Sequence, residues 1–373
     1  MNPTISNLEE QENTLRFRIA GVNVSFANAL RRIMLSEIPC VVMKALPHET
    51  STIDITENTT RMNNELLKQR ISCVPVHIND TTAPIENYLI EVDKTNDGDV
   101  IDFVTTEDFK IKDKSTDKYL TQAQVRAIFP PDPITNEYID IARLRPRISA
   151  ELEGEQLTFT ATFEVDVAKN DGAYVVVSTC CYQNTPDPDA ISKKWAELEK
   201  LLAASGKTAD LIEFEKKDFY YLQAQKLFVP DSFDFIVESI GQFTNTDVVF
   251  RATHVMLNKL ELFKQAIQTN PEIIKESNTT LQNSFDIKLI GEDYTLGKAI
   301  EFVLYNKYYS MSDDKPVNFC GFRKPHPHIN ESLIRVAFRE PTEKSTVVSI
   351  LLESAKSIEK VFQKISEDFK LTE

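Results

Sequence analysis

Two segments of the sequence imitate ligand-binding loops, and each departs from its motif at a position that the chemistry requires. Residues 291–299, GEDYTLGKA, are close to a phosphate-binding loop, but five residues separate the glycines and Ala299 stands where a hydroxyl must reach Mg²⁺. Residues 93–104, DKTNDGDVIDFV, are close to a calcium loop, but Val104 replaces the glutamate that binds the ion. We therefore predict no nucleotide at the first segment and a polar hairpin turn at the second.

The histidines and cysteines do not form a recognisable metal or catalytic motif. His326 and His328 share one face of an extended segment, but no cysteine or carboxylate accompanies them at the spacing of metal ligands. The five cysteines include no CxxC pair, and we predict that they are buried, reduced thiols. No nucleophile motif such as GxSxG is present. The sequence thus disfavours an enzyme, leaving open only a site assembled from distant residues, and it predicts no metal and no cofactor.

The charge balance excludes one class of protein. The chain has 373 residues with 57 acidic and 42 basic side chains, a net charge of −15, which excludes a simple basic module that binds nucleic acid. Residues 81–284 hold 34 acidic and 21 basic side chains, whereas 1–80 and 285–373 are nearly neutral. The length predicts two or three domains. No signal peptide and no stretch of 18 apolar residues occurs, so we expect neither secretion nor a membrane span.

Hydrophobic periodicity predicts the elements of the N-terminal region. Residues 14–21 alternate like a half-buried strand, and a helix follows in which Ser25 is the expected cap and Pro39 prevents continuation. Further expected elements are strands within 41–46 and 50–56, a helix within 62–71 and an extended segment that ends near residue 78. Residues 81–230 contain proline clusters and alternating runs, which predict a mainly β insert with a helix at 191–206.

The C-terminal region repeats this organisation after a long helix. An apolar stripe predicts an amphipathic helix at about 247–268, and the polar residues 269–284 are expected to form a linker. A strand, a helix that starts at Thr295, two further strands and a final helix at about 343–370 follow. Both ends of the chain thus offer a small sheet and a long helix with a wide apolar face. We expect each to complete the core of the other.

Two motifs near the N-terminus resemble the alpha-like subunits of DNA-directed RNA polymerases. These are the bacterial alpha subunit, the archaeal D subunit and the third-largest subunit of eukaryotic RNA polymerase II. The family's NALRR core and its E-x-P are matched by Asn28, Ala29, Leu30, Arg31, Arg32, Glu37 and Pro39. A second element is matched by Glu65, Leu67, Arg70 and Pro75, while Asn64, Gln69 and Ser72 depart from it.

The C-terminal region resembles the eleventh subunit of polymerase II and the archaeal L subunit. Residues 292–297, EDYTLG, match the EDHTLGN turn from strand to helix, with Tyr294 in place of His and Lys298 in place of Asn. Phe319, Gly321, Phe322 and the PHP at 325–327 match a further element. The resemblance implies that the apparent phosphate loop is a helix start and that the PHP segment is a strand edge.

The resemblance implies an α+β fold and a role in assembly. Dimerisation units at 1–80 with 231–268 and at 285–373 would form an intramolecular pseudo-dimer, with residues 81–230 as the insert domain. In the family such a dimer is the non-catalytic platform for the two large catalytic subunits. The expected pseudo-dimer core is Phe26, Ile33, Met256, Leu260, Phe263, Leu296, Ile300, Leu351, Ile358 and Phe362. The expected surface for other subunits is Asn28, Leu30, Arg31, Arg32, Glu37, Pro39, Glu65, Arg70 and Pro75.

Partners and source are also implied by the resemblance. The expected partners are the two largest polymerase subunits and a small zinc-type assembly subunit, with DNA and RNA reached only through the complex and no membrane. Fusion of both halves in one chain implies a large nucleocytoplasmic DNA virus, and therefore the host cytoplasm or the virion. Two alternatives stay open: a protein that mimics the platform to bind a host polymerase, and a stand-alone enzyme with its site in the insert.

Overall fold

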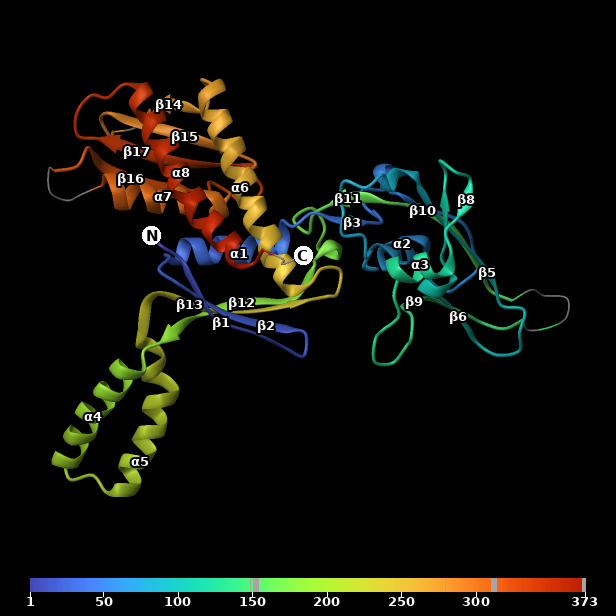
Figure 1. Cartoon of the computed structure of the whole chain (residues 1–373), viewed down its shortest axis with the longest axis horizontal. Helices are drawn as coiled ribbons and strands as arrows, with labels where there is room; N and C mark the ends of the chain where they lie inside the picture. Colours follow the sequence, from blue (N-terminus) through green and yellow to red (C-terminus); the bar gives the residue numbers. More distant parts are fainter. Residues whose placement is uncertain (148, 150–153, 279, 310–313, 371–373) are drawn as a thin grey trace. The chain divides into compact units, whose positions relative to one another are not determined.

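The computed structural model describes residues 1–147, 149, 154–278, 280–309 and 314–370. They form two units. Unit 1 contains Met1–Ile33, Thr179–Glu238 and Asn245–Glu373, and unit 2 contains Met34–Ser178 and Ser239–Thr244 (Figure 1). These units do not coincide with the predicted domains, because residues 34–80 lie with the insert in unit 2 and residues 179–230 lie in unit 1.

The first sheet of unit 1 has the strand order β1–β2–β13–β12. Its strands are β1 (Thr4–Gln11), β2 (Thr14–Ala20), β13 (Phe228–Ser239) and β12 (Val177–Pro186). The predicted alternation of β2 is confirmed, since Leu15, Phe17 and Ile19 are buried. The antiparallel register of β2 and β13 places Phe17 opposite Phe235, and their rings stack with centroids 5.1 Å apart. One face of this sheet is therefore a continuous apolar layer.

Two helices of unit 1 follow strands of this sheet in the chain. Helix α1 (Val24–Ser36) ends before Pro39, as predicted, but its start differs from the prediction. The cap is Asn23 and not Ser25, because Asn23 Oδ1 accepts hydrogen bonds from the Ser25 amide at 3.0 Å and the Ser25 hydroxyl at 2.9 Å. Helix α6 (Asn245–Thr269) buries the predicted stripe, including Met256 and Leu260.

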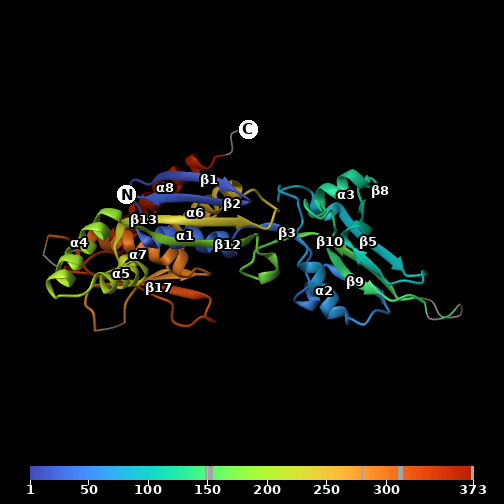
Figure 2. The same ribbon diagram turned by 90° about the horizontal axis from the view of Figure 1, so that it is seen from below.

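A helical hairpin connects β12 to β13 within unit 1 (Figure 2). It consists of α4 (Pro188–Ala204), α5 (Ala209–Asp218), a π-helical turn (Phe219–Gln223) and a 3₁₀ turn (Ala224–Lys226). Gly206 ends α4 with a φ of +75°, a conformation that glycine adopts without steric cost. Trp195, Phe219 and Ala224 form a small core of the hairpin's own. The hairpin is therefore a local substructure with its own apolar cluster.

The second sheet of unit 1 has the order β14–β15–β17–β16, and its neighbouring strands are antiparallel. Its strands are β14 (Ile274–Glu276), β15 (Ser284–Ile290), β17 (Glu331–Phe338) and β16 (Val317–Arg323). Helices α7 (Tyr294–Tyr308) and α8 (Lys344–Asp368) complete this region. The predicted linker at 269–284 needs correction, because it contains β14 with Ile273 and Ile274 buried. Residues 274–276 of that polar stretch thus form an edge strand that pairs with β15.

The described residues of unit 2 form three antiparallel strand groups. The largest has the order β4–β10–β5–β7–β8, with β4 (Ile53–Asn58), β10 (Gln156–Thr162), β5 (Tyr88–Thr95), β7 (Lys110–Asp113) and β8 (Lys118–Tyr119). The two pairs are β3 (Cys40–Val42) with β11 (Glu164–Asp166), and β6 (Asp102–Thr105) with β9 (Asp140–Leu144). Helices α2 (Asn64–Ser72) and α3 (Gln122–Ile128) join a core that includes Phe159 and Leu67. The α+β class is confirmed in both units.

Two smaller expectations for these segments are wrong. Residues 93–104 do not form a hairpin turn, because β5 pairs with β10 and β7 whereas β6 pairs with β9. The PHP residues 325–327 follow β16 and lie in the connection to β17, outside either strand. Among the residues that the structure describes, no helix combines the length and apolar character needed to cross a membrane.

Candidate functional site

An internal interface of unit 1 joins its N-terminal part, up to Thr269, to its C-terminal part, from Asn270 onward. Helix α6 of the N-terminal part packs along α8 of the C-terminal part, and α7 packs against α8 (Figure 1). All ten residues of the expected pseudo-dimer core are at most 6% exposed. Because apolar stripes of this width are stable in water only when covered, the two parts complete one core.

Aromatic rings cross this interface. Phe26 of α1 lies 6.0 Å from Phe362 of α8 and 6.0 Å from Phe302 of α7, measured between ring centroids. Phe17 of β2 meets Phe369, just after α8, edge to face at 4.9 Å. Phe26 and Phe362 are at most 1% exposed, so they occupy the dry centre of the interface. Such pairs add about 1 kcal/mol beyond the burial of their area.

Ion pairs fix the register of the two parts at the edge of this core. Arg32 of α1 donates from Nη2 to Asp293 Oδ2 at 2.7 Å and from Nε to Thr295 Oγ1 at 3.0 Å. Lys259 of α6 lies 2.8 Å from Glu292, and Lys264 lies 2.6 Å from Glu359 of α8. Directional bonds of this kind add specificity that an apolar stripe lacks, because a stripe tolerates sliding.

The segment that imitates a phosphate loop is the start of α7, as predicted. Asp293 Oδ1 accepts from the Thr295 amide at 3.0 Å and caps the helix, while its other oxygen receives Arg32. Gly297 has a packing role, because a Cβ there would lie 2.0 Å from the ring of Phe322 on β16. Within GEDYTLG, Asp293 therefore caps the helix, and Gly297 allows the helix to pack closely against the sheet.

The residues expected to contact other subunits fall in both units. Asn28, Leu30, Arg31 and Arg32 lie on α1 in unit 1, whereas Glu37, Pro39, Glu65, Arg70 and Pro75 lie in unit 2. Asn28 Oδ1 accepts from Arg31 Nε at 3.1 Å and from Nη2 at 2.9 Å. Leu30 is fully buried, so its expected contact with another subunit is corrected to a role in the core. Arg32 has an intramolecular partner that the sequence interpretation did not include.

The unit 2 members of that group have structural partners of their own. Arg70 donates from Nε to the Ile141 carbonyl at 2.8 Å and from Nη2 to the Asp140 carbonyl at 2.7 Å, which ties α2 to β9. Glu65 is exposed in the first turn of α2. Glu37 is 8% exposed. Contact of these side chains with another protein stays a prediction.

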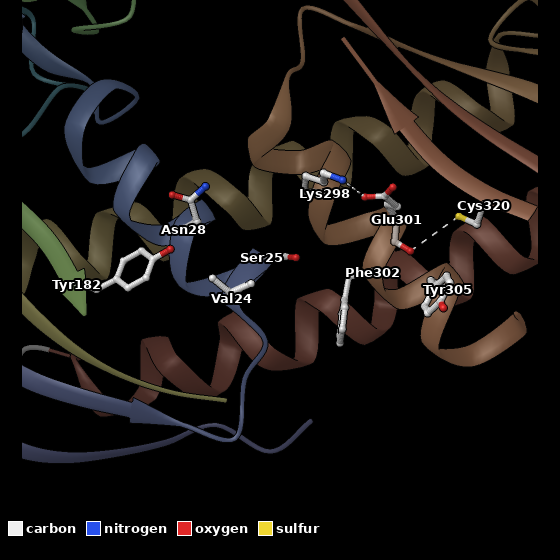
Figure 3. Close-up of a pocket in the computed structure, with 9 residues that line it drawn as sticks. All are labelled: Val24, Ser25, Asn28, Tyr182, Lys298, Glu301, Phe302, Tyr305 and Cys320. Carbon is white, nitrogen blue, oxygen red and sulfur yellow. Dashed lines mark hydrogen bonds and ion pairs between the residues drawn. The ribbon is translucent and has the colours of Figure 1, made fainter. Parts of the chain in front are cut away.

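A pocket of about 520 Å³ opens beside the interface of unit 1 (Figure 3). Asn28 of α1 and Tyr182 of β12 lie on one side of it, and Lys298 and Glu301 of α7, which form an ion pair, lie on the other. Cys320 also lines the pocket, but burial raises the pKa of its thiol to about 12. A protonated thiol is a weak nucleophile, so Cys320 is not activated for covalent chemistry.

The other candidate chemical residues are likewise dispersed. The rings of His326 and His328 meet edge to face at 4.9 Å in the connection between β16 and β17, and the His328 amide donates to His326 Nδ1 at 3.2 Å. Within the described residues, no three histidine, cysteine or acidic side chains are placed to hold one metal ion. Cys40 and Cys180 are buried as predicted, but Cys73 and Cys181 are exposed, which corrects the expectation for those two thiols.

Comparison with known proteins agrees with this architecture. The family profile of the RNA polymerase Rpb3/Rpb11 dimerisation domain matches residues 16–260, and a second profile of the same description matches residues 284–368. The chain belongs to the RNA polymerase Rpb3/Rpb11 dimerisation domain family, and it carries two such matches.

Individual relatives are similar at low identity over long alignments. DNA-directed RNA polymerase subunit Rpo3 of Pyrococcus furiosus is 23% identical over 281 residues, which cover 70% of this chain and 95% of that subunit. Subunit RPAC1 of the DNA-directed RNA polymerases I and III of Saccharomyces cerevisiae is 24% identical over 302 residues, or 70% of this chain and 85% of that subunit. Subunit 3B of the polymerases IV and V of Arabidopsis thaliana is 21% identical, with 72% and 92% covered.

Sequence reasoning missed the polar contacts that join the two parts. Arg32 and Asp293 were each singled out, but as members of separate motifs 261 positions apart. Lys259, Lys264 and Glu359 were not singled out at all. The sequence does contain a pattern that predicts partners for the two lysines. Both lie on α6 next to its buried stripe, where a charged side chain must either pair with an opposite charge or extend into water.

Proposed function

We propose that this chain is a non-catalytic subunit of a multisubunit DNA-directed RNA polymerase and that it supplies, in one polypeptide, the dimeric platform on which the two largest subunits assemble. The observation that carries the proposal is the packing of α6 on α8, two helices from two separate dimerisation-domain matches. A small zinc-type assembly subunit is the third expected partner. DNA and RNA are reached only through the complex.

Joining the two parts in one chain has a physical consequence. A tether converts association of two subunits into an intramolecular step at roughly millimolar effective concentration. It also holds their stoichiometry at one to one. The Pyrococcus subunit is covered over 95% of its length by 70% of this chain, which leaves room for a second, fused partner and supports the proposal of a natural fusion.

The first experiment tests the pseudo-dimer directly. A specific protease site is inserted after Thr269, between α6 and β14, and the cleaved protein is analysed by size-exclusion chromatography at micromolar concentration. We expect the two fragments to elute together, because the core that they share is fully buried. Separation of the fragments in native buffer would contradict the pseudo-dimer.

The second experiment tests the platform. The tagged chain is expressed in its native host, and co-purifying proteins are identified by mass spectrometry. Leu260→Asp with Leu351→Asp places charges in the core and should abolish capture of the large subunits. The matched control is Leu262→Asp with Ser349→Asp, since both side chains are exposed on the same two helices. Unchanged capture by the core variant would overturn the proposal, and capture of a host polymerase alone would favour a mimic of the platform.

A separate part of the proposal concerns the organism from which the chain comes. A fused platform fits a large DNA virus that transcribes in the host cytoplasm and packages its polymerase in the virion. Immunofluorescence of infected cells and mass spectrometry of purified particles test this part. Detection only in the nucleus and absence from particles would contradict it.

A further inference from the structure

Two adjoining pockets on unit 2 form a groove that the pseudo-dimer does not use. The first, of about 360 Å³, is lined by Arg61, Arg143 and Arg145 together with Met62. The second, of about 520 Å³, is again lined by Met62; its other apolar lining includes Leu66 and Ile139, and Arg70, Gln69 and Asp140 add polar groups. Met62 lines both pockets, and we call the two pockets together the arginine groove. All of its residues lie in unit 2.

Strand pairing explains why the groove is both cationic and apolar. β6 and β9 pair with Phe103 opposite Arg143, and the Arg143 guanidinium lies 6.0 Å from the Phe103 ring. Leu144 points into the core, so its neighbours Arg143 and Arg145 face solvent on the same side. The apolar end carries Leu66, 50% exposed, and Ile139, 43% exposed. Large aliphatic side chains in a concave surface are typical of binding sites.

The charge of the groove is opposite to that of its surroundings. Unit 2 has 25 acidic and 14 basic side chains, a net charge of −11. Four of its six arginines line the two pockets. This concentration of arginine in an acidic unit marks a local site for negative charge.

Not all four arginines are available to a ligand. Arg145 lies 2.5 Å from Glu155 and is paired with it. Burial alone would raise the pKa of Glu155. The pKa is nevertheless lowered, because the hydrogen bonds from Arg145 and the positive charges of Arg145 and Arg61 stabilise the ionised carboxylate more than burial destabilises it. Arg70 donates to the carbonyls of Asp140 and Ile141. Arg61 and Arg143 are exposed and supply the remaining positive charge. These two guanidinium groups are suited to paired bonds with carboxylates.

We propose that the arginine groove binds an extended segment of a partner protein, with acidic side chains at Arg61 and Arg143 and large apolar side chains against Leu66 and Ile139. A nucleic acid fits less well, because its affinity comes from many phosphate contacts and the net charge of −11 on unit 2 repels a long polyanion. The aliphatic side chains of Leu66 and Ile139 also cannot form hydrogen bonds or ion pairs with a phosphate backbone. This inference does not depend on the proposed polymerase role, which rests on unit 1.

Selection of peptides tests the inference without knowledge of the partner. A displayed library of random twelve-residue peptides is selected against the full chain, and enriched peptides are measured by fluorescence anisotropy. We expect enriched sequences to combine Asp or Glu with Leu, Ile or Phe. Arg61→Glu with Arg143→Glu should weaken their binding about thirtyfold or more, since it replaces attraction by repulsion. Leu66→Ser with Ile139→Ser should weaken it about tenfold.

A matched variant controls for net charge and folding. Arg126→Glu with Lys110→Glu makes the same change in charge at two exposed positions of unit 2 outside the groove, and it should bind the peptides as the wild type does. Circular dichroism checks that each variant is folded. Arg145 is left unchanged, because its loss would strand the carboxylate of Glu155.

Any of three results with the peptides would overturn the inference. The selection yields no peptide that binds below about 100 μM, or the peptides lack acidic residues, or the Arg61→Glu, Arg143→Glu variant binds them unchanged. A labelled 20-nucleotide oligouridylate and a single-stranded DNA of equal length are measured in parallel at 150 mM salt. Binding of either oligonucleotide that is lost in the groove variant alone would assign the groove to nucleic acid instead.

Discussion

Arg32 Nη2 lies 2.7 Å from Asp293 Oδ2, and this ion pair joins the first helix of the N-terminal part of unit 1 to the cap of α7 in the C-terminal part. The two side chains are 31% and 20% exposed, so the pair is screened only in part. One carboxylate oxygen of Asp293 thus caps α7, and the other accepts the hydrogen bond from Arg32 in the N-terminal part of unit 1. The same carboxylate links local structure to the proposed platform.

Substitution at this pair should separate the two roles of Asp293. Arg32→Ala should lower the free energy of unfolding by about 1 kcal/mol through loss of the ion pair. Asp293→Ala should cost about 2 kcal/mol, because the cap is lost as well. Asp293→Asn is the matched control, since asparagine caps as well as aspartate but carries no charge. Urea unfolding followed by circular dichroism provides the measurement.

A double-mutant cycle gives the sharper result for the same pair. We expect a coupling of about 1 kcal/mol between Arg32→Ala and Asp293→Asn. Additive effects, with no coupling, would show that the pair does not stabilise the contact between the two parts.

The ring pair Phe26 and Phe362 should contribute much more than the ion pair. Phe362→Ala leaves a cavity in a core that is fully buried, and it should cost about 3 to 5 kcal/mol. In protein cleaved after Thr269, the same change should cause the fragments to separate on size-exclusion chromatography. Phe214→Ala serves as the control, because Phe214 is 68% exposed and should change stability by less than about 0.5 kcal/mol. Equal effects of the two variants would contradict this packing.

The cysteines should react according to their exposure. Cys73 and Cys181 are exposed, so an aromatic disulfide reagent at pH 8 should modify these two thiols quickly. The half-buried Cys320 should react more slowly, and the buried Cys40 and Cys180 only after unfolding. Rapid modification of all five in the native protein would contradict the burial of Cys40 and Cys180. The reaction is followed by absorbance, with denatured protein as the reference for five thiols.

Alkaline pH should destabilise the protein through the buried thiols. Burial raises the pKa of Cys180 to about 12 from its ordinary value near 9. Above pH 9 the thiol loses its proton in the unfolded chain but keeps it in the folded chain, so stability falls as pH rises toward 12. Removing this group by Cys180→Ala should reduce that pH slope by up to about 1.4 kcal/mol per pH unit. An identical slope between pH 9 and 10 in both proteins would count against burial of the thiol.

The helical hairpin should unfold before the rest of unit 1. Its own core has three buried residues, Trp195, Phe219 and Ala224, which is small for independent stability. Trp195 is the only tryptophan, so its fluorescence reports on the hairpin alone. We expect the fluorescence transition in urea at a lower concentration than the transition in circular dichroism. Coincident transitions would show that the hairpin unfolds together with the sheet from which it extends.

Local pattern was sufficient for the helices and strands of the interface. The alternation of β2, the stripe of α6 and the stripe of α8 each depend on neighbouring residues, and the structure places these elements as predicted. The start of α7 at GEDYTLG was also readable, because a cap is made within one turn of the chain. The cap of α1 was misplaced by two residues, since Asn23 and Ser25 are both good capping residues.

Only the tertiary structure decided which charges pair and where the units divide. Arg32 reaches Asp293 across 261 positions of sequence, and such a pair depends on α1 meeting the start of α7, which no local window contains. Residues 34–80 join unit 2 because β4 pairs with β10, about 100 positions further along. The arginine groove likewise needs β6 and β9 to meet. The sequence by itself determined the elements and their apolar faces, because those depend on near neighbours, whereas the pairs between distant charges required the fold.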